Sequence, residues 1–335
     1  MTLSPPPTDG AYTYTLSLDT NVPSLVRKYY ESGDAGTIGS EFPKFLIRLS
    51  GHLNGTDILP YLFENIDRIG EEDCLATLRA CIALFRCDVE NLKATGEISC
   101  PLPPDEIEDE ATRMVSHLQS EEREPINEWA LRNWTGAYCT LLAAASVQLQ
   151  HRRKSPQNRM RILFNLLDDT LLMMPQREVM AAYGLFEGDS YERFFRRVQP
   201  GATDLLGLIR NLAWDISIPR TMADNVAATA RGSNQHRDFV VPHLATFDGD
   251  LADLLVDQQA NGLYTFLMQG AKTGFVYPTP ILERYASAAE AEEQLFAPEK
   301  RRRRIESTQR MIDDSDYRAE IVARAETLAT DAQNG

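Results

Sequence analysis

The chain has 335 residues, of which 43% are hydrophobic and 25% charged, a composition that excludes collagen-like, low-complexity and extensively disordered proteins. Its 34 basic and 49 acidic residues leave a net charge of −15, which argues against coating nucleic acid or docking on an anionic membrane. No apolar run approaches the roughly 18 residues of a membrane span, and no signal-peptide pattern opens the chain. Because the five cysteines have no zinc-type spacing and are odd in number, we expect reduced thiols and a cytoplasmic protein.

The first half of the chain predicts one strand followed by helices. Tyr12–Leu18 alternates β-branched and aromatic residues, as in a strand, and ends at Asp19. A helix is expected over Val22–Tyr30. From Phe42 to Leu149 apolar residues recur at helical spacing almost throughout, which predicts a bundle of about five or six helices.

Strands and helices alternate in the second half. The predicted strands are Thr170–Met174, Phe239–Thr246 and Gly274–Tyr277, and the predicted helices are Gln176–Tyr183, Thr203–Ala230 with a kink at Pro219, and Leu251–Ala260 with a further helical stretch to Gln269. Such alternation predicts a parallel sheet, which binds ligands beyond the C-terminal ends of its strands. After Pro280 the chain is helical, highly charged and poor in apolar residues, which predicts a surface helix or charged tail.

Two acids follow predicted strands closely. Asp19 comes directly after the first strand, and Asp248 comes two residues after Phe239–Thr246. Because parallel strands end at the same rim of a sheet, both carboxylates are expected there. A single aspartate at such a position more often caps a helix or a turn. Two of them in one sheet favour a shared site.

A third acid is expected on the long helix. At about 100° per residue, Asp215 falls in an apolar stripe with Leu212 and Pro219, where an unpaired carboxylate would cost several kcal/mol. A base or a metal ion should therefore pair with it. Asp224 lies on the polar face, where an ordinary ion pair with Arg220 is the favoured interpretation.

A fourth acid, Glu178, lies in the first turn of the predicted helix Gln176–Tyr183. A carboxylate at this position either stabilises the helix N-terminus or reaches the rim that carries Asp19.

These residues resemble those of PIN-domain nucleases. Leu16-Ser-Leu-Asp19-Thr-Asn21 is similar to the opening strand motif of the family, Leu244-Ala-Thr246-Phe-Asp248 to its late strand, and Gly274-Phe-Val-Tyr-Pro-Thr-Pro280 to its closing strand. Met174-Pro-Gln-Arg-Glu178 and Asp215 fit the intervening acids in the same order. The resemblance covers Tyr12 to about Tyr30 and Asp168 to Arg284. Two features depart from the family: the helical block is far larger, and the long spacing to Asp248 leaves the third acid open between Asp215 and Asp224.

The resemblance implies a PIN-like α/β fold, with a three-layer α/β/α domain around a central parallel sheet. This domain would comprise residues 1–36 and 156–290, interrupted by an all-helical insertion over 37–155. A charged helical tail would follow over 291–335.

The predicted chemistry is metal-assisted. Phosphodiester hydrolysis needs an activated water and a stabilised leaving oxygen, and Mg²⁺ or Mn²⁺ held by carboxylates supplies both. Two bare carboxylates about 4 Å apart repel by roughly 4 kcal/mol at an effective dielectric of about 20, so converging acids call for a cation. The predicted ligands and catalytic acids are Asp19, Glu178, Asp215 and Asp248. Asp250 is either a fifth ligand or a helix cap, and Asn21 and Thr246 are expected to orient ligands or water.

Nucleic acid would have to bind through local basic clusters. The predicted contacts are Arg152, Arg153 and Lys154, which follow His151 and precede Arg159 and Arg161, and Arg193, Arg196 and Arg197, which are interleaved with Tyr191, Phe194 and Phe195. Lys300–Arg304 is a further cluster. Each cluster taken singly is more often a solvated face, but aromatic residues between cations suit stacking of single-stranded bases.

We therefore expect a Mg²⁺- or Mn²⁺-dependent endonuclease that acts on RNA (tRNA or single-stranded) rather than DNA, in the manner of a toxin or defence effector. Such an enzyme leaves room for a protein inhibitor or regulator and for a homodimer, and it has no membrane partner. The alternative is a catalytically inactive PIN-like scaffold that binds a protein or RNA through its helical domain.

Overall fold

The computed structural model describes residues 12–33, 36, 38–173, 176–188, 195–232, 239–257, 262–266, 272–276 and 297–334. The chain is mostly helical and contains a small parallel sheet, so it is a mixed α/β protein with a large helical content. It divides into two compact units: unit 1 is Met1–Trp129 with Met222–Asp248, and unit 2 is Ala130–Thr221 with Gly249–Gly335. These units do not follow the predicted boundaries, since the helices after residue 36 belong to the same unit as the first strand.

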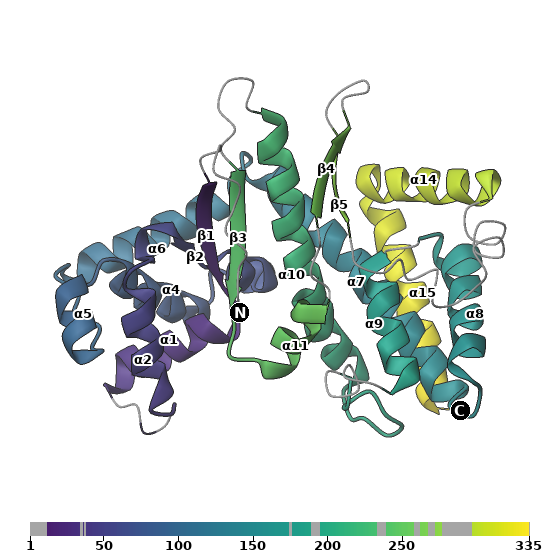
Figure 1. Ribbon diagram of the computed structural model, residues 1–335, viewed down its shortest axis with the longest axis horizontal. Helices are drawn as coiled ribbons and strands as arrows, with labels where there is room; N and C mark the ends of the chain where they lie inside the picture. The colour runs from purple at the N-terminus through teal and green to yellow at the C-terminus, as the bar shows by residue number, and fades with distance from the viewer. Residues whose placement is uncertain are drawn as a thin grey trace. The chain divides into compact units, whose positions relative to one another are not determined.

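Unit 1 contains the three-stranded sheet and most of the predicted helical block (Figure 1). Its elements are β1 (Tyr12–Leu18), α1 (Asn21–Ser32), α2 (Glu41–Leu49), the 3₁₀ turn η2 (Leu53–Gly55), β2 (Thr56–Asp57), α3 (Leu59–Glu64), the 3₁₀ turn η3 (Ile66–Arg68), α4 (Glu72–Phe85), α5 (Val89–Thr95), α6 (Pro104–Leu118) and β3 (Phe239–Ala245). Two long helices, α7 (Glu124–Gln150) and α10 (Leu205–Gly232), run from one unit into the other.

The sheet of unit 1 has the order β2-β1-β3, and both pairings are parallel. β1 and β3 pair in register from Tyr12 opposite Phe239 to Leu18 opposite Ala245. The predicted strands at both positions are thus confirmed. The two-residue strand β2 was not predicted, because it is too short to show any alternation. As the central strand, β1 delivers Asp19 to the middle of the sheet's C-terminal edge.

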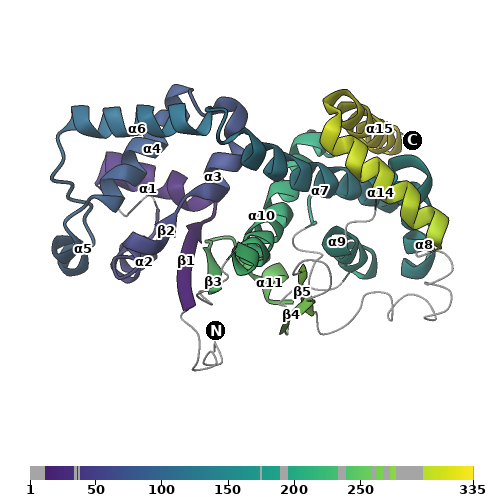
Figure 2. The same cartoon turned by 90° about the horizontal axis from the view of Figure 1, so that it is seen from above.

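Helices α1 to α6 supply the core of unit 1. In α1 the residues Val22, Val26 and Tyr29 are buried at spacings of four and three, which confirms the amphipathic pattern. Figure 2 shows α1, α2 and α4 beside the sheet on the side on which β2 lies. The buried residues of these helices form one hydrophobic cluster with Leu18 of β1.

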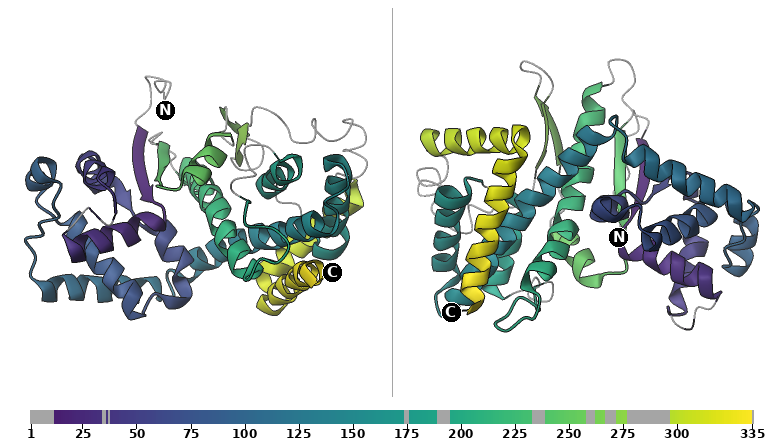
Figure 3. Two further views of the ribbon diagram at one scale, coloured as in Figure 1. Left: turned by 90° about the horizontal axis from the view of Figure 1, so that it is seen from below. Right: turned by 180° about the vertical axis from the view of Figure 1, so that it is seen from behind.

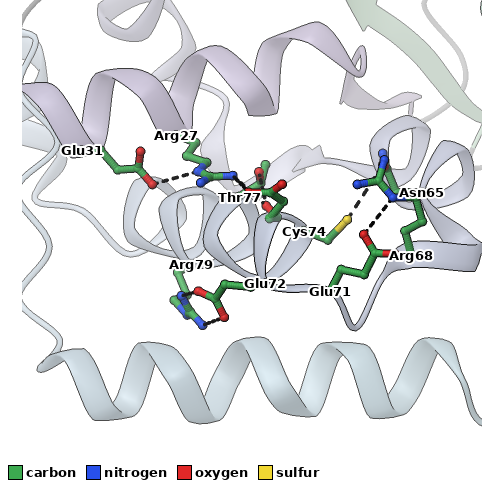
Figure 4. A network of polar contacts seen from close by, with 10 residues as sticks. Arg27, Glu31, Asn65, Arg68, Glu71, Glu72, Cys74, Thr77 and Arg79 are labelled. Atoms are coloured by element: carbon green, nitrogen blue, oxygen red, sulfur yellow. Dashed lines mark hydrogen bonds and ion pairs between the residues drawn. The ribbon is translucent and has the colours of Figure 1, made fainter.

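Surface ion pairs lie within the helices of unit 1 and also between them. Arg27 of α1 bonds to Glu31 at 2.8 Å and to the carboxylate of Asp73 in α4 at 3.2 Å, and Arg79 of α4 bonds to Glu72 at 2.7 Å (Figure 4). Because such surface pairs contribute only about 0–1 kcal/mol each, the buried cluster remains the main support of the sheet.

Unit 2 is built mainly from helices. Besides its parts of α7 and α10 it contains α8 (Pro156–Leu166), the π-helical turn η4 (Leu167–Leu171), α9 (Gln176–Glu187), α11 (Gly249–Asp257), β4 (Gly262–Phe266), β5 (Lys272–Val276), α14 (Pro298–Asp313) and α15 (Ser315–Asn334). The predicted helices at α9, α10 and α11 are confirmed, and Pro219 lies inside α10.

The prediction of a strand over Thr170–Met174 is wrong. Leu167–Leu171 continues α8 as a π-helical turn, which ends where Leu172 adopts a left-handed backbone with φ of 52°. Met174 and Pro175 lie outside the described residues. A short apolar run is compatible with either a buried strand or a buried helix, so periodicity could not separate the two.

Two predictions near the end of the α/β part also need correction. The expected helical stretch to Gln269 contains the strand β4, and the expected closing strand at Gly274 is β5. These two strands pair antiparallel in a sheet of their own and do not join the parallel sheet.

The C-terminal helices are not a peripheral tail. α14 and α15 meet at a corner (Figure 3), and α15 buries Tyr317, Ile321, Ala325 and Ala329 at four-residue spacing. The sequence does not predict this buried stripe, because two of its positions are alanine and a third, Tyr317, carries a polar hydroxyl. No helix in the described part of the chain combines the length and apolar character needed to cross a membrane.

Candidate functional site

Asp19 occupies the C-terminal edge of the parallel sheet in unit 1. Its backbone N–H donates to the carbonyl of Ala245 at 2.9 Å, which extends the pairing of β1 and β3 by one residue. Its carbonyl accepts from the N–H of Val22 at 2.8 Å, at the start of α1. The residue is only 2% exposed. A carboxylate is thus buried between a strand end and a helix N-terminus, and the helix dipole favours its negative charge.

The hydroxyl of Thr246 connects the two strand ends. It donates to Oδ2 of Asp19 at 2.7 Å and accepts from the backbone N–H of Asp248 at 2.9 Å. The side-chain amide of Asn21 also donates to it, at 3.4 Å. Because the single hydroxyl proton goes to Asp19, Asn21 must present its NH₂ group to Thr246. The structure therefore brings together four of the predicted residues: Asp19, Asn21, Thr246 and Asp248.

Two carboxylates at this edge, those of Asp19 and Glu64, have raised pKa values. Burial raises the pKa of Asp19, and the negative charge of Asp248 raises it further. Glu64, half-buried at the end of α3, has a raised pKa because of burial and of the charge on Asp19. Asp248 itself is exposed. No Lys, Arg or His of the described residues forms an ion pair with Asp19 or Glu64.

Glu64 was missed by the sequence interpretation. It is the last residue of a short helix, and nothing in its spacing distinguishes it from the other acids of the helical block. Only the packing of α3 near β1 brings it close to Asp19. A further polar atom at this edge is the side-chain oxygen of Asn21, which is buried and has no hydrogen-bond partner.

Asp57 is a fourth acid of the sheet and has a different role. Its Oδ2 accepts from the hydroxyl of Ser17 at 3.0 Å, and its Oδ1 accepts from the backbone N–H of Leu59 at 2.9 Å, where α3 begins. Both oxygens are therefore bonded within the protein. Although burial raises the pKa of Asp57, we interpret it as a capping residue.

Glu178 lies in unit 2, in the first turn of α9, as predicted. Its side chain is buried, and Oε1 accepts from Arg220 of α10 at 3.2 Å. Its other oxygen, Oε2, is buried without a hydrogen-bond partner. Arg220 thus pairs with Glu178, while its expected pair with Asp224 stays a prediction because that side chain lies outside the described residues. Asn133 and Thr221, bonded to each other at 3.3 Å, are also buried in unit 2.

Asp215 is half-buried and also belongs to unit 2. Leu208 and Pro219, which share its stripe, are half-buried too, whereas Ile209 and Ile216 on the adjacent side are almost fully buried. Leu212 of the same stripe is buried, however, so the stripe is only partly buried and the role of Asp215 stays a prediction.

The remaining predicted acids are not further distinguished by the structure. The side chain of Asp224 lies outside the described residues. Asp250 is half-buried in the first turn of α11, in unit 2. The structure groups Asp19 with Asp248 and Glu64 in unit 1, and the convergence of Glu178 and Asp215 with them remains a prediction.

The predicted basic contacts differ in exposure. The exposed side chains are Arg152, Arg153, Lys154, Arg196 and Arg197, while Arg193, Tyr191 and Phe194 lie outside the described residues. Phe195 is only 2% exposed, so the prediction that it stacks with bases is wrong.

Other basic residues support unit 2 from within. Arg159 is buried, donates to Gln148 and to the carbonyl of Phe186, and lies over the Phe186 ring. Lys300 and Arg304 approach the buried carboxylate of Asp168 at 3.0 and 3.5 Å. Arg159, Lys300 and Arg304 therefore make contacts within the protein, and we assign them a structural role.

Among the residues that the structure describes, no three His, Cys, Asp or Glu side chains are grouped closely enough to hold a metal ion by themselves. Comparisons with protein-family models, curated proteins and solved structures find no match for this chain.

Proposed function

We propose that the chain is a metal-dependent endonuclease that hydrolyses phosphodiester bonds, with RNA favoured over DNA, and that Asp19 is the centre of its active site. One observation carries the proposal: a carboxylate buried at the C-terminal edge of a parallel sheet is linked through the Thr246 hydroxyl to a second acid residue, Asp248, and forms no ion pair with a cation of the described residues. Burying such a charge is costly unless a partner compensates it. A divalent cation, held by one or two carboxylates and by water, is a partner that suits this charge.

The donor atoms fit a hard cation. Asp19, Glu64 and Asp248 offer carboxylate oxygens, and Asn21 offers the buried, unpartnered amide oxygen. Mg²⁺ is commonly held by one or two carboxylates, retained waters and the phosphates of its substrate, so it does not require a cage of three protein acids. Oxygen donors without Cys or His favour Mg²⁺ or Mn²⁺ over zinc.

The surrounding residues hold Asp19 in place. The Thr246 hydroxyl fixes one oxygen of Asp19, and the Asp248 N–H and the Asn21 amide fix that hydroxyl. A bound divalent cation activates water and neutralises charge on a phosphodiester. Asp248, whose charge acts on Asp19, and Glu64, on which the charge of Asp19 acts, are suited to accept a proton from that water or to share the cation.

The finer architecture forms part of the proposal. A PIN-like three-layer organisation is supported by the first strand lying in the middle of the parallel sheet, with Asp19 and Asp248 after adjacent strands. In this proposal the helical region restricts the substrate, as suits a toxin or defence effector.

The proposal is tested by cleavage of labelled tRNA, single-stranded RNA and single-stranded DNA in the presence of Mn²⁺ or EDTA. The parent should cut RNA in Mn²⁺ only, and Asp19→Asn and Asp248→Asn should reduce the rate at least 100-fold. The matched control Asp109→Asn removes an exposed carboxylate from α6 of the same unit and should cut normally. Undiminished cleavage by Asp19→Asn, or by the parent in EDTA, would contradict the proposal.

A second candidate, a PIN-like scaffold that binds RNA or protein without cutting, is favoured by the ion pair of Glu178 with Arg220. This pair already neutralises one of the predicted catalytic acids. The two candidates differ in their need for metal: a scaffold should bind its partner equally well in Mn²⁺ and EDTA and should cut none of the three substrates.

A further inference from the structure

Phe247 has an unusual position between the two residues that define the candidate site. It directly follows Thr246 and directly precedes Asp248, yet its side chain is 44% exposed. We call the end of the sheet that carries Asp19, Glu64 and Asp248 the acidic edge. Successive Cα atoms are about 3.8 Å apart, so the backbone that carries the ring lies within a few ångströms of this edge. A large exposed aromatic side chain at such an edge is available to a ligand.

The ring of Phe247 is held in place by two aromatic residues of α2. Its centroid lies 5.0 Å from that of Phe45 in an edge-to-face arrangement and 5.8 Å from that of Phe42. Phe42 is buried and packs in turn against Tyr29 of α1 at 5.5 Å. We call Phe45 and Phe247 the aromatic platform. The platform packs on the core, so its side chains are already ordered. A ligand that stacks on it therefore binds with little loss of side-chain entropy.

The helix that supports the platform also carries exposed cations. Lys44 and Arg48 are one turn apart on α2, and Arg48 is three residues from Phe45, so these side chains share one side of the helix. Glu41 bonds to Lys44 at 2.7 Å, which leaves this side of α2 with one net positive charge. In a chain with a net charge of −15, this is a local exception beside an acidic site.

We propose that the aromatic platform, together with Lys44 and Arg48, binds single-stranded RNA, with one base stacked on Phe247 and a neighbouring phosphate near Arg48. The inference rests on the proposed function, since it supplies the substrate contact for the same acidic edge. Stacking on an aromatic ring tolerates any base, and a cation beside the ring meets the backbone. Bases within a duplex are already stacked on each other, which directs the platform to single strands.

The platform also offers what the basic clusters of unit 2 lack among the described residues, an exposed aromatic ring on which a base can stack. Phe195, the aromatic residue beside Arg196 and Arg197, is buried and cannot stack with a base. In unit 1, by contrast, the exposed ring of Phe247 precedes Asp248 directly and packs on α2, which carries two exposed cations.

The test measures binding separately from cleavage. A fluorescein-labelled, unstructured single-stranded RNA of about 12 nucleotides is titrated with protein in EDTA and followed by fluorescence anisotropy. Phe247→Ala should weaken binding about tenfold, the order expected for one stacked base, and Phe247→Trp should restore it. Arg48→Gln should weaken binding less and lower the slope of log K against log salt by about one. A duplex of the same sequence should be insensitive to Phe247→Ala.

Matched controls come from the same unit. Tyr30→Ala removes a comparably exposed aromatic ring (40% exposed) from α1, and Lys28→Gln removes an exposed cation. Neither should change RNA binding. Circular dichroism establishes that each variant keeps its helical content.

The outcomes separate this inference from the proposed function. If the parent binds RNA and Phe247→Ala binds equally well, the platform is refuted while the nuclease proposal stands. If Phe247→Ala weakens binding but no substrate is cut in Mn²⁺, the platform is supported and the nuclease proposal fails. A parent that binds no single strand refutes the platform and points to an apolar protein partner for Phe247.

Discussion

The hydroxyl of Thr246 holds the acidic edge together, and its loss has a predictable cost. The change Thr246→Val removes the hydrogen bonds of this one oxygen and preserves the shape of the side chain. Three bonds are lost: the donation to Asp19 at 2.7 Å, and the acceptances from the Asp248 N–H at 2.9 Å and from Asn21 at 3.4 Å. A hydrogen bond to a charged group contributes about 1.5–3 kcal/mol and a neutral one about 0.5–1.5 kcal/mol. The long third bond adds little. Because Thr246 is only half-buried, we expect the lower part of the sum, about 2 kcal/mol.

The assay is urea unfolding followed by circular dichroism, with Thr246→Ser as the control that keeps the hydroxyl and loses a methyl group. Thr246→Val should lower the free energy of unfolding by about 2 kcal/mol at pH 7, and Thr246→Ser by less than about 1 kcal/mol. Losing its donor should also raise the pKa of Asp19 further, so the deficit of Thr246→Val should shrink at acidic pH. Equal destabilisation by both variants would refute the assignment of Thr246 as the residue that holds Asp19.

Three further predictions concern buried charges. Burial raises the pKa of Asp19, so the folded chain holds this proton more tightly than the unfolded chain does, and parental stability in EDTA should fall as the pH rises through the folded pKa. Asp19→Asn should therefore raise the free energy of unfolding at pH 7, and this gain should disappear at acidic pH, as measured by urea titrations across that range. Arg220→Met leaves the buried Glu178 without its partner and should cost about 3 kcal/mol in the same assay; adding Glu178→Gln should recover most of this loss, and an undiminished loss would contradict the pairing. Lys300→Met removes one of the two ion pairs between α14 and the buried Asp168, so a protease should cut α14 faster than in the parent. Equal cutting rates would contradict a stabilising role of Lys300.

The sequence predicted the elements that surround the acidic edge because their signals are local. The alternation in Tyr12–Leu18 predicted β1, Phe239–Thr246 was predicted as the strand that is β3, and Asp19 and Asp248 were singled out because they follow these strands closely. Thr246 and Asn21 were also placed at this edge. Parallel pairing then brings the four together without any further information.

Local sequence patterns do not predict contacts between elements that are far apart in the chain. Glu64 reaches Asp19 only because α3 packs near β1, and Arg220 of α10 pairs with Glu178 of α9, 42 residues earlier in the chain. Likewise, a five-residue apolar run at Thr170–Met174 carries no period that separates a strand from the π-helical turn. Phe247 was read only as a spacer in a motif, and its exposure depends on the packing of α2.

The central claim is that the carboxylate of Asp19 belongs to a site for a divalent cation. The most direct measurement is a calorimetric titration of Mn²⁺ into the metal-free parent and into Asp19→Asn, with Asp109→Asn as the control for loss of one negative charge. The parent and the control should each bind Mn²⁺ with a saturable heat that Asp19→Asn lacks. Absence of saturable binding in the parent, or equal binding by Asp19→Asn, would contradict the claim.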